Sequence, residues 1–304
     1  MPSPEYRVWD VNNDWPFPRE VMLSCLPEVV RILEWAHAEG IEQRTPGWYA
    51  RRNQLTVSGS ILNDIVGKGY ADKRKDSSGK GTDGWNTCFL SKVGLDPAPF
   101  NGNKATLHGQ KYEDEAFDKW CKQEGMHGFT MGLLQHPGYD YMGGSPDGLT
   151  ARGNVVEIKC PLNRWIKVGE FPSYYDLQPR FYSHLMGMQA QDSVFLQYKP
   201  GEVFGFEVLD HVMVPFNPEY TLGAIKTAEN FNTAVQEARK TGVVPESVLE
   251  FRRFAVKRRL KYDFGRTCPE IGWPDEYLDD LFKQGEPPLS DAGMDEILEE
   301  CMMS

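Results

Sequence analysis

The sequence predicts an α/β fold in which helices flank a central mixed β-sheet. Two observations support this class. Apolar residues recur at helical spacing in several stretches, and short runs rich in β-forming residues lie between them, bounded by Gly and Pro. In the middle of the chain the order is a helix, three strands, a helix and further strands. A chain of 304 residues with 40% hydrophobic content is large enough to bury a core around such a sheet.

The N-terminal part is expected to be mostly helical. Residues 1–20 contain several prolines and show no apolar period, so they are predicted to form an irregular arm. Residues 27–39 are predicted to form a helix that ends at Gly40. A further helix is expected to begin near Ser58, because apolar residues follow it at helical spacing. Residues 67–84 carry five basic residues among Gly, Ser and Asp, which indicates a loop with little to bury.

The central helices and strands are predicted from the spacing of apolar residues and from the Gly and Pro residues that separate the segments. Residues 103–122 show helical spacing. Residues 128–135 and 139–145 are predicted to be two strands that form a hairpin around His136-Pro137-Gly138. Residues 155–159 form a third strand, rich in β-branched residues. Three strands are therefore expected directly after one long helix.

The C-terminal half is predicted to complete the sheet and cover it. A helix is expected to start at Asp176 as its N-cap, with an apolar stripe behind it. Residues 193–198 and 203–214 are predicted to be the closing strands, and residues 218–240 a helix across the sheet. Residues 251–262 hold six bases among apolar residues, which predicts a basic helix.

Negative charge is concentrated at the C-terminus. The net charge is -11, yet residues 263–304 hold twelve acidic residues against two bases, so the rest of the chain is near neutral. We therefore predict one domain over residues 1–262, with its core at about 44–240, and an acidic extension over 263–304. Residues 275–282 and 294–302 are predicted to be short amphipathic helices in it.

Composition also narrows the class of protein. No run of about 20 apolar residues is present, and the N-terminus lacks a basic and then apolar signal region, so we expect an intracellular protein without a membrane anchor. The six cysteines are scattered without a Cys-x-x-Cys pair. This spacing argues against a zinc site, an iron–sulfur cluster or a disulfide framework.

A catalytic centre is predicted around the strand at residues 155–159. Because side chains alternate across a strand, Glu157 and Lys159 share one face while Val156 and Ile158 share the other. Asp147 follows a Gly-Gly-Ser-Pro break and is expected to bring a second carboxylate beside Glu157. Two carboxylates and an ammonium suit metal-dependent phosphodiester hydrolysis. The alternative is a tight turn before an ordinary strand with a Glu–Lys surface pair.

A third carboxylate is predicted on the preceding helix. Glu113 stands on the same face as Ala116, Phe117 and Trp120, whereas Glu115 stands on the opposite face. Burying a carboxylate is costly unless a cation compensates it, so Glu113 is expected to be a third metal ligand. The alternative is a carboxylate at the helix margin that reaches solvent.

These residues carry a family resemblance. Asp147 followed by Glu157-Ile158-Lys159 resembles the PD-(D/E)XK nuclease signature. The strings Ser-Pro-Asp-Gly-Leu and Glu-Ile-Lys-Cys-Pro resemble the branch of bacteriophage lambda exonuclease and the YqaJ-type viral recombinases, over about residues 44–215. The resemblance implies a restriction-endonuclease-like core. It also implies that Mg2+, or Mn2+ as a substitute, binds Glu113, Asp147, Glu157 and the Ile158 carbonyl, while Lys159 positions the attacking water.

The resemblance further implies a pocket for the terminal phosphate of DNA. Arg51 and Ser58 have the family's spacing of an Arg followed seven residues later by a Ser at a helix start, and Arg52 is the rival of Arg51. An Arg and free helix N–H groups suit phosphate. The other positions that match the family's DNA-binding residues are Lys104, Ser145 and Gln178.

The leading hypothesis is a Mg2+-dependent exonuclease of phage or viral recombination that digests one strand of linear duplex DNA from 5′ to 3′. By resemblance it would form a trimer and work with a single-strand annealing or binding protein. A structure-specific endonuclease on the same core is one alternative. A non-catalytic scaffold that binds DNA ends is another, although three converging carboxylates would repel phosphate without contributing to binding.

Overall fold

The computed structural model describes residues 6–70, 83–95 and 103–267, with only the backbone described for 257–267. Contacts divide the chain into two compact units, and each is described by itself. The larger unit comprises residues 1–84 and 102–232, and the smaller one comprises 85–101 and 233–304. Within the described ranges, no helix has the length and apolar character needed to cross a membrane.

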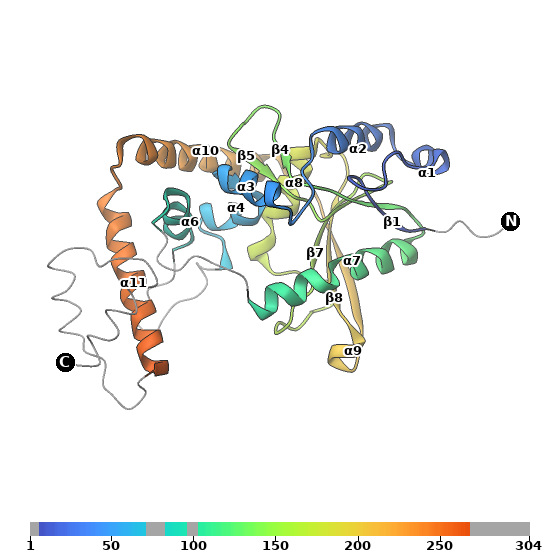
Figure 1. Ribbon diagram of the computed structural model, residues 1–304. Coiled ribbons are helices and arrows are strands. Elements are labelled where there is room, and N and C mark those ends of the chain that lie inside the picture. The colour runs from blue at the N-terminus through green and yellow to red at the C-terminus, as the bar shows by residue number, and fades with distance from the viewer. Residues whose placement is uncertain (1–5, 71–82, 96–102, 268–304) are drawn as a thin grey trace. The chain divides into compact units, whose positions relative to one another are not determined.

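The larger unit is built on a six-stranded mixed sheet (Figure 1). Its strands, in spatial order, are β1 (Val8–Asp10), β3 (Gly128–Thr130), β6 (Gly148–Thr150), β7 (Val155–Lys159), β8 (Ser193–Lys199) and β9 (Val208–Val214). The pairs β1–β3 and β7–β8 are parallel, and the other neighbours are antiparallel. The predicted central mixed sheet flanked by helices is confirmed.

Strand β8 is buried along its whole length of seven residues. It pairs in parallel with β7, from Val156 beside Val194 to Lys159 beside Gln197. Parallel neighbours require a crossover connection. Here the connection contains the short 3-10 helix η1 (Ser173–Tyr175) and α8 (Leu177–Met186).

Helix α7 (Lys104–Glu124) covers one face of β7 and β8 (Figure 1). The Asn103 side chain accepts a hydrogen bond from the Thr106 N–H and caps the helix start. Gly125 ends the helix in the left-handed conformation, at φ 63°. The buried residues of α7 pack against Val156 and Ile158 of β7 in one apolar cluster. The predicted long helix is therefore confirmed and extends to Glu124.

A small second sheet lies in the same unit, in the order β2 (Val57–Ser58), β5 (Met142–Gly144) and β4 (Leu134–Gln135). Strands β4 and β5 form the predicted hairpin in a shorter version. The single strand expected over 128–135 is wrong, because the chain leaves the large sheet after Thr130 and enters the small one at Leu134. Gly132 allows this crossing, since a Cβ there would lie 2.4 Å from the Ile41 carbonyl oxygen.

The N-terminal part contains the two expected helices, α2 (Pro27–Glu39) and α4 (Gly59–Ile65), and two that were not predicted, α1 (Arg19–Ser24) and α3 (Pro46–Gln54). The prediction of an irregular arm over residues 1–20 is wrong for Val8–Asp10, which pair with β3 as strand β1. No local period marks β1, because it is three residues long and its partner lies 120 residues further along the chain. Tertiary pairing decides its conformation.

The end of the large sheet also differs from the prediction. Strand β9 begins at Val208 rather than at residue 203, because residues 201–204 form the short helix α9 (Gly201–Phe204). Gly205, at φ 74°, ends that helix and returns the chain to the sheet. Asp176 makes no side-chain cap bond at the start of α8 and pairs with Arg180 instead.

The smaller unit contains the helix α6 (Gly84–Val93) from Trp85 onwards, the end of α10 (Pro218–Thr241) and α11 (Glu246–Thr267). The predicted helices at 218–240 and 251–262 are present in α10 and α11. The predicted start of the acidic extension, at residue 263, falls within α11. Residues 268–304 lie outside the described residues, as do 71–82 of the predicted basic loop, so the predictions for both stay predictions.

Candidate active site

The residues of the predicted centre come together where β7 lies next to residues 145–147, the segment that joins β5 to β6. The Lys159 ammonium pairs with the Glu157 carboxylate, so these side chains share one face of β7 as predicted. Asp147 lies just before β6, and its Oδ2 accepts a hydrogen bond of 2.7 Å from the Ile158 N–H. Asp147 is thereby fixed directly against the backbone of β7.

The cluster carries more negative than positive charge. Burial, and then repulsion from Asp147, raises the pKa of Glu157 to about 8. Burial also raises the pKa of Asp147. For Lys159, burial disfavours the charged form, but attraction to Glu157 and Asp147 outweighs it and raises the pKa. The Glu157 Oε2 atom is buried and has no hydrogen-bond partner. These groups would be stabilised by a further cation.

Glu113 of α7 faces the same place. Burial, followed by repulsion from Asp147, raises its pKa to about 7. Its carboxylate forms an ion pair of 2.6 Å with Arg44, and its side chain is 25% exposed. Glu115 instead faces away and accepts a hydrogen bond from the Tyr198 hydroxyl. The predicted difference in facing between the two glutamates is confirmed.

Arg44 is a residue of this site that sequence reasoning missed. Its backbone is left-handed, with φ 66°, which is strained for a residue with a long side chain. The strain costs about 1–2 kcal/mol. No local period marks Arg44, and its partner Glu113 is 69 residues away. Arg44 directly precedes Thr45, the N-cap of α3, and a single basic residue at such a position does not indicate a functional site.

A cavity of about 250 Å3 opens beside one side of this centre, and neither Glu157 nor Lys159 is among its lining residues. Its lining includes Arg44, Glu113, Asp147 and Ile158. As the described residues stand, no three Asp, Glu, His or Cys side chains are arranged to hold a metal ion. Cationic and N–H groups of the protein occupy carboxylate oxygens here, since Arg44 contacts Glu113 and the Ile158 N–H contacts Asp147. The donor set still fits a hard cation, because Glu157 Oε2 is free and the carboxylates repel one another.

The two candidate phosphate-binding arginines point to different places. Arg51 donates to Gln54 and to Gln135 of β4. Arg52 lies over the Trp48 ring, 4.7 Å from its centroid, and donates to the Ser60 hydroxyl at 3.4 Å. Ser58 lies at the start of α4, and its hydroxyl is 3.1 Å from that of Ser60. Arg52, the rival in the prediction, is therefore beside the serines of α4.

The remaining candidates gather partly around Tyr182 of α8. Gln178 is buried and contacts the Tyr182 hydroxyl at 3.4 Å. The same ring packs against Gly144, where an added Cβ would lie 2.4 Å from it. Ser145 accepts a hydrogen bond of 2.7 Å from the Trp48 indole. Lys104, in contrast, is exposed at the first residue of α7.

Comparison with known proteins gives one family and a few relatives. The model of the YqaJ-like viral recombinase domain matches residues 47–200. Uncharacterized protein R354 of Acanthamoeba polyphaga mimivirus is 32% identical over 126 residues, which is 36% of this chain and 23% of the relative. The chain thus matches about a quarter of the length of that relative.

Two solved structures are also similar. They are LHK-Exo in complex with dAMP and the alkaline exonuclease LHK-Exo from Laribacter hongkongensis. Each has 20% sequence identity and a TM-score of 0.47, and each match covers 70% of this chain and 99% of the other. The family match spans half of the chain and includes Glu113, Asp147, Glu157 and Lys159, so the chain belongs to the YqaJ-like viral recombinase family.

Proposed function

We propose that this protein is a nuclease, namely a divalent-metal-dependent DNA exonuclease of a viral or phage recombination system. The observation that supports this best is the group of Asp147, Glu157 and Lys159, in which Glu157 is buried and one of its carboxylate oxygens has no partner among the described residues. A fold rarely buries several carboxylates around one lysine unless a ligand compensates the charge. In a nuclease, a bound metal ion would supply that compensation.

The proposed metal ligands are Glu113, Asp147, Glu157 and the carbonyl of Ile158. The carbonyl is included because the N–H and C=O groups of one strand residue point to the same side, and the Ile158 N–H faces Asp147. All four offer the hard oxygen atoms that Mg2+ prefers, and Mn2+ would be a substitute. When bound, the ion would stabilise phosphate charge and lower the pKa of its water.

Lys159 would hold the attacking water and neutralise charge on the phosphate. Its ammonium is fixed by Glu157, and it lies 5.3 Å from the centroid of the Tyr175 ring. Such a fixed, partly buried donor needs little reorganisation when charge develops in the transition state. The Lys159→Met variant should therefore lose catalysis while it keeps most of its affinity for DNA.

Action at DNA ends is supported by the group around α3, α4 and α8. Ser58, Ser145, Gln178 and one of the two arginines would form the pocket for a 5′-phosphate, and Lys104 would contact the backbone. The resemblance to the lambda exonuclease branch supports 5′-to-3′ digestion of linear duplex DNA, a trimer and cooperation with a single-strand annealing or binding protein inside the host cell.

The test compares linear and covalently closed circular duplex DNA, each with Mg2+ and with EDTA. We expect degradation of linear DNA only, which requires Mg2+ and is lost in Glu157→Gln. Glu113→Gln should raise the Mg2+ requirement more than Glu115→Gln, because Glu115 faces a different network. Equal effects of the two glutamine variants would contradict the assignment of Glu113.

The same experiment separates the runner-up functions. Nicking of closed circles at the rate of linear degradation would indicate a structure-specific endonuclease on the same core. DNA binding without cleavage in any divalent metal would indicate an end-binding scaffold. Three neighbouring carboxylates oppose the scaffold, since they would repel DNA phosphate without a metal ion.

A further inference from the structure

Lys199 is a buried cation that the proposed chemistry does not use. It is the last residue of β8, and only 3% of its surface is exposed. Its ammonium lies over the rings of Phe204 and Trp165, at 4.0 Å and 5.1 Å from their centroids. Among the described residues it has no hydrogen bond and no carboxylate within ion-pair distance. A buried cation of this kind is costly unless a ligand supplies the missing charge.

Two further donors stand beside Lys199. His108 of α7 contacts the Phe204 ring, with the centroids 5.8 Å apart, and Arg164 follows β7 directly before Trp165. The Arg164 Nη2 atom and the His108 Nε2 atom are both buried without a hydrogen-bond partner. Burial and then repulsion from Arg164 lower the pKa of Lys199, and burial and then repulsion from Lys199 lower that of His108. Lys199 is therefore close enough to be repelled by Arg164 and to repel a proton from His108.

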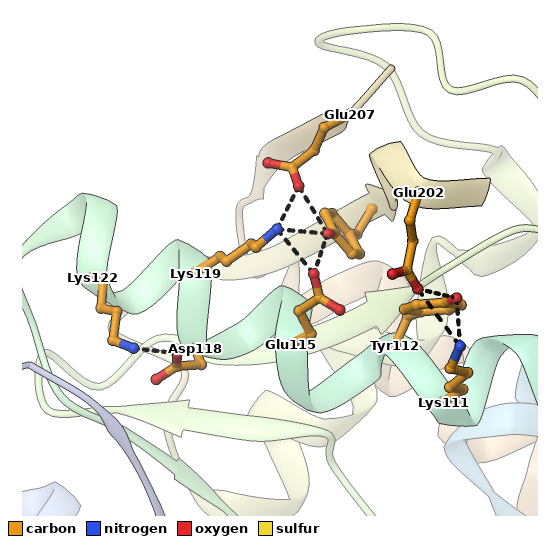
Figure 2. Close-up of polar contacts among 9 residues, drawn as sticks. Lys111, Tyr112, Glu115, Asp118, Lys119, Lys122, Glu202 and Glu207 are labelled. Carbon is orange, nitrogen blue, oxygen red and sulfur yellow. Dashed lines mark hydrogen bonds and ion pairs between the residues drawn. The ribbon is translucent and has the colours of Figure 1, made fainter. Parts of the chain in front are cut away.

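Three glutamates of α7, α9 and the segment after α9 have partners outside this cluster, and Figure 2 shows those partners. Glu202 accepts a hydrogen bond of 2.8 Å from the Tyr112 hydroxyl and lies 3.6 Å from the Lys111 ammonium. Glu115 and Glu207 both pair with Lys119 on the exposed side of α7. These carboxylates are therefore already paired with Lys111 or Lys119, and none of them pairs with Lys199.

The position of the cluster relates it to the catalytic centre. In the register of the parallel pair, Lys159 lies beside Gln197, so Lys199 is two residues further along the neighbouring strand, in the direction in which β7 ends. His108 precedes Glu113 on the same helix by just over one turn. The cluster thus lies at the carboxyl end of the two strands that carry the site, where the first turns of α7 begin.

We propose that His108, Arg164 and Lys199 bind a backbone phosphate of the DNA strand on which the nuclease acts, one or more nucleotides away from the scissile bond. This inference rests on the proposed DNA substrate. A phosphate would accept hydrogen bonds from the free N–H groups and compensate the cation, and Arg is well suited to it. Trp165 is 70% exposed and stacks on Phe206 with an interplanar angle of 3°, which offers a flat face to an adjacent base.

The experiment measures the binding of a fluorescein-labelled single-stranded oligonucleotide in EDTA, at several KCl concentrations. Lys199→Met and Arg164→Met should each weaken binding about tenfold and lower the salt dependence of log K by about one. Lys122→Met is the matched control, because it removes the same charge from a surface pair with Asp118. It should change the affinity less than about twofold.

Thermal unfolding separates a binding role from a structural one. Loss of an uncompensated buried cation should raise the melting temperature of Lys199→Met, whereas loss of a purely structural contact to Phe204 and Trp165 should lower it. A lower melting temperature with an unchanged salt slope would overturn the proposal, as would binding equal to that of Lys122→Met.

The outcome for the site is separate from the outcome for the proposed function, because binding in EDTA requires no cleavage. A nuclease whose affinity for DNA is insensitive to Lys199 would refute the site alone. A protein that cuts no DNA, yet loses affinity and salt dependence in Lys199→Met, would refute the proposed function and keep the site.

Discussion

At the scale of single residues, the carboxylates of the candidate site are held by two protein cations with different surroundings. Lys159 is fixed on β7 beside Glu157. Arg44 approaches from a strained loop position, and 40% of its side chain is exposed. Because Arg44 contacts the same carboxylate that we assign to the metal ion, it competes with that ion for Glu113.

The first prediction concerns this competition. Arg44→Gln should lower the Mg2+ concentration needed for half-maximal nuclease activity by about two- to fivefold, since a partly exposed ion pair contributes up to about 1 kcal/mol. A titration of activity with Mg2+ measures it. Arg31→Gln, which removes an exposed arginine paired with Glu28, serves as control. An increased Mg2+ requirement in Arg44→Gln would show that Arg44 assists the metal site.

The second prediction distinguishes Arg51 from Arg52. Replacing the arginine that holds a terminal phosphate with Ala should lower the nuclease activity on 5′-phosphorylated ends by about 10- to 100-fold. The same replacement should change the activity on 5′-hydroxyl ends only a little. The contact between Arg52 and Ser60 leads us to expect this loss in Arg52→Ala, with a smaller one in Arg51→Ala. Rates of both variants on both ends form double-mutant cycles. Absence of coupling in both would remove the end pocket from this region.

Sequence reasoning at this scale succeeded where chemistry follows local spacing. The shared face of Glu157 and Lys159 follows from alternation along one strand, and the facing of Glu113 from helical period. Arg44 and Lys199 carry no such signal. Their environments depend on partners that are far away in sequence, and a basic residue near a turn or strand end resembles any solvated lysine or arginine.

At the scale of elements, two partly buried histidines join the turn after β4 to helix α8. The rings of His136 and His184 stack with centroids 5.5 Å apart. Burial lowers the pKa of both, and His184 lowers that of His136 further. Both are therefore favoured as neutral groups in the folded protein. Protonation of either would disfavour this contact between α8 and the hairpin.

The third prediction follows from the sign of these shifts. A histidine whose pKa is lower in the folded state contributes stability that is present above its ordinary value of 6.5 and is lost as the pH falls below it. The free energy of unfolding of wild type should therefore drop between pH 7 and pH 5 relative to that of His184→Gln. Urea denaturation at both values measures the difference. The buried carboxylates act in the opposite direction in both proteins, so they cancel in the comparison.

Long elements were predictable and short ones were not. Helices α7 and α10 and strands β7 and β8 carry several periods of pattern and were placed nearly at their bounds. Strands β1 and β3 have three residues each, and α9 has four, so their conformation depends on neighbours in the sheet. The break at Gly132 had no local sign other than the glycine itself.

At the scale of the whole molecule, charge is unevenly distributed along the chain. Residues 268–304 hold eleven acidic residues against Lys283. An acidic segment of this size opposes the approach of DNA over a screening length of about 10 Å at 0.1 M salt. The remainder of the chain has a net charge close to zero.

The fourth prediction is that truncation after Thr267 preserves Mg2+-dependent cleavage and raises the affinity for DNA several-fold at low salt. Anisotropy of labelled duplex DNA at 50 and 200 mM KCl measures the effect. The gain should shrink at the higher salt, where the charges are screened. Aggregation or loss of cooperative unfolding would instead show that the extension is required for folding.

The parallel pairing of β7 with β8 would also determine when during synthesis the proposed nuclease becomes active. Lys159, the last of the candidate catalytic residues, is translated 40 residues before the end of β8. Until β8 has left the ribosome, β7 lacks its parallel partner, and the acidic centre lacks the dry surroundings that it has in the finished sheet. At about 5–20 residues per second, translation of that interval takes about 2–8 seconds. We expect the nascent chain to be harmless to nearby nucleic acid during this time.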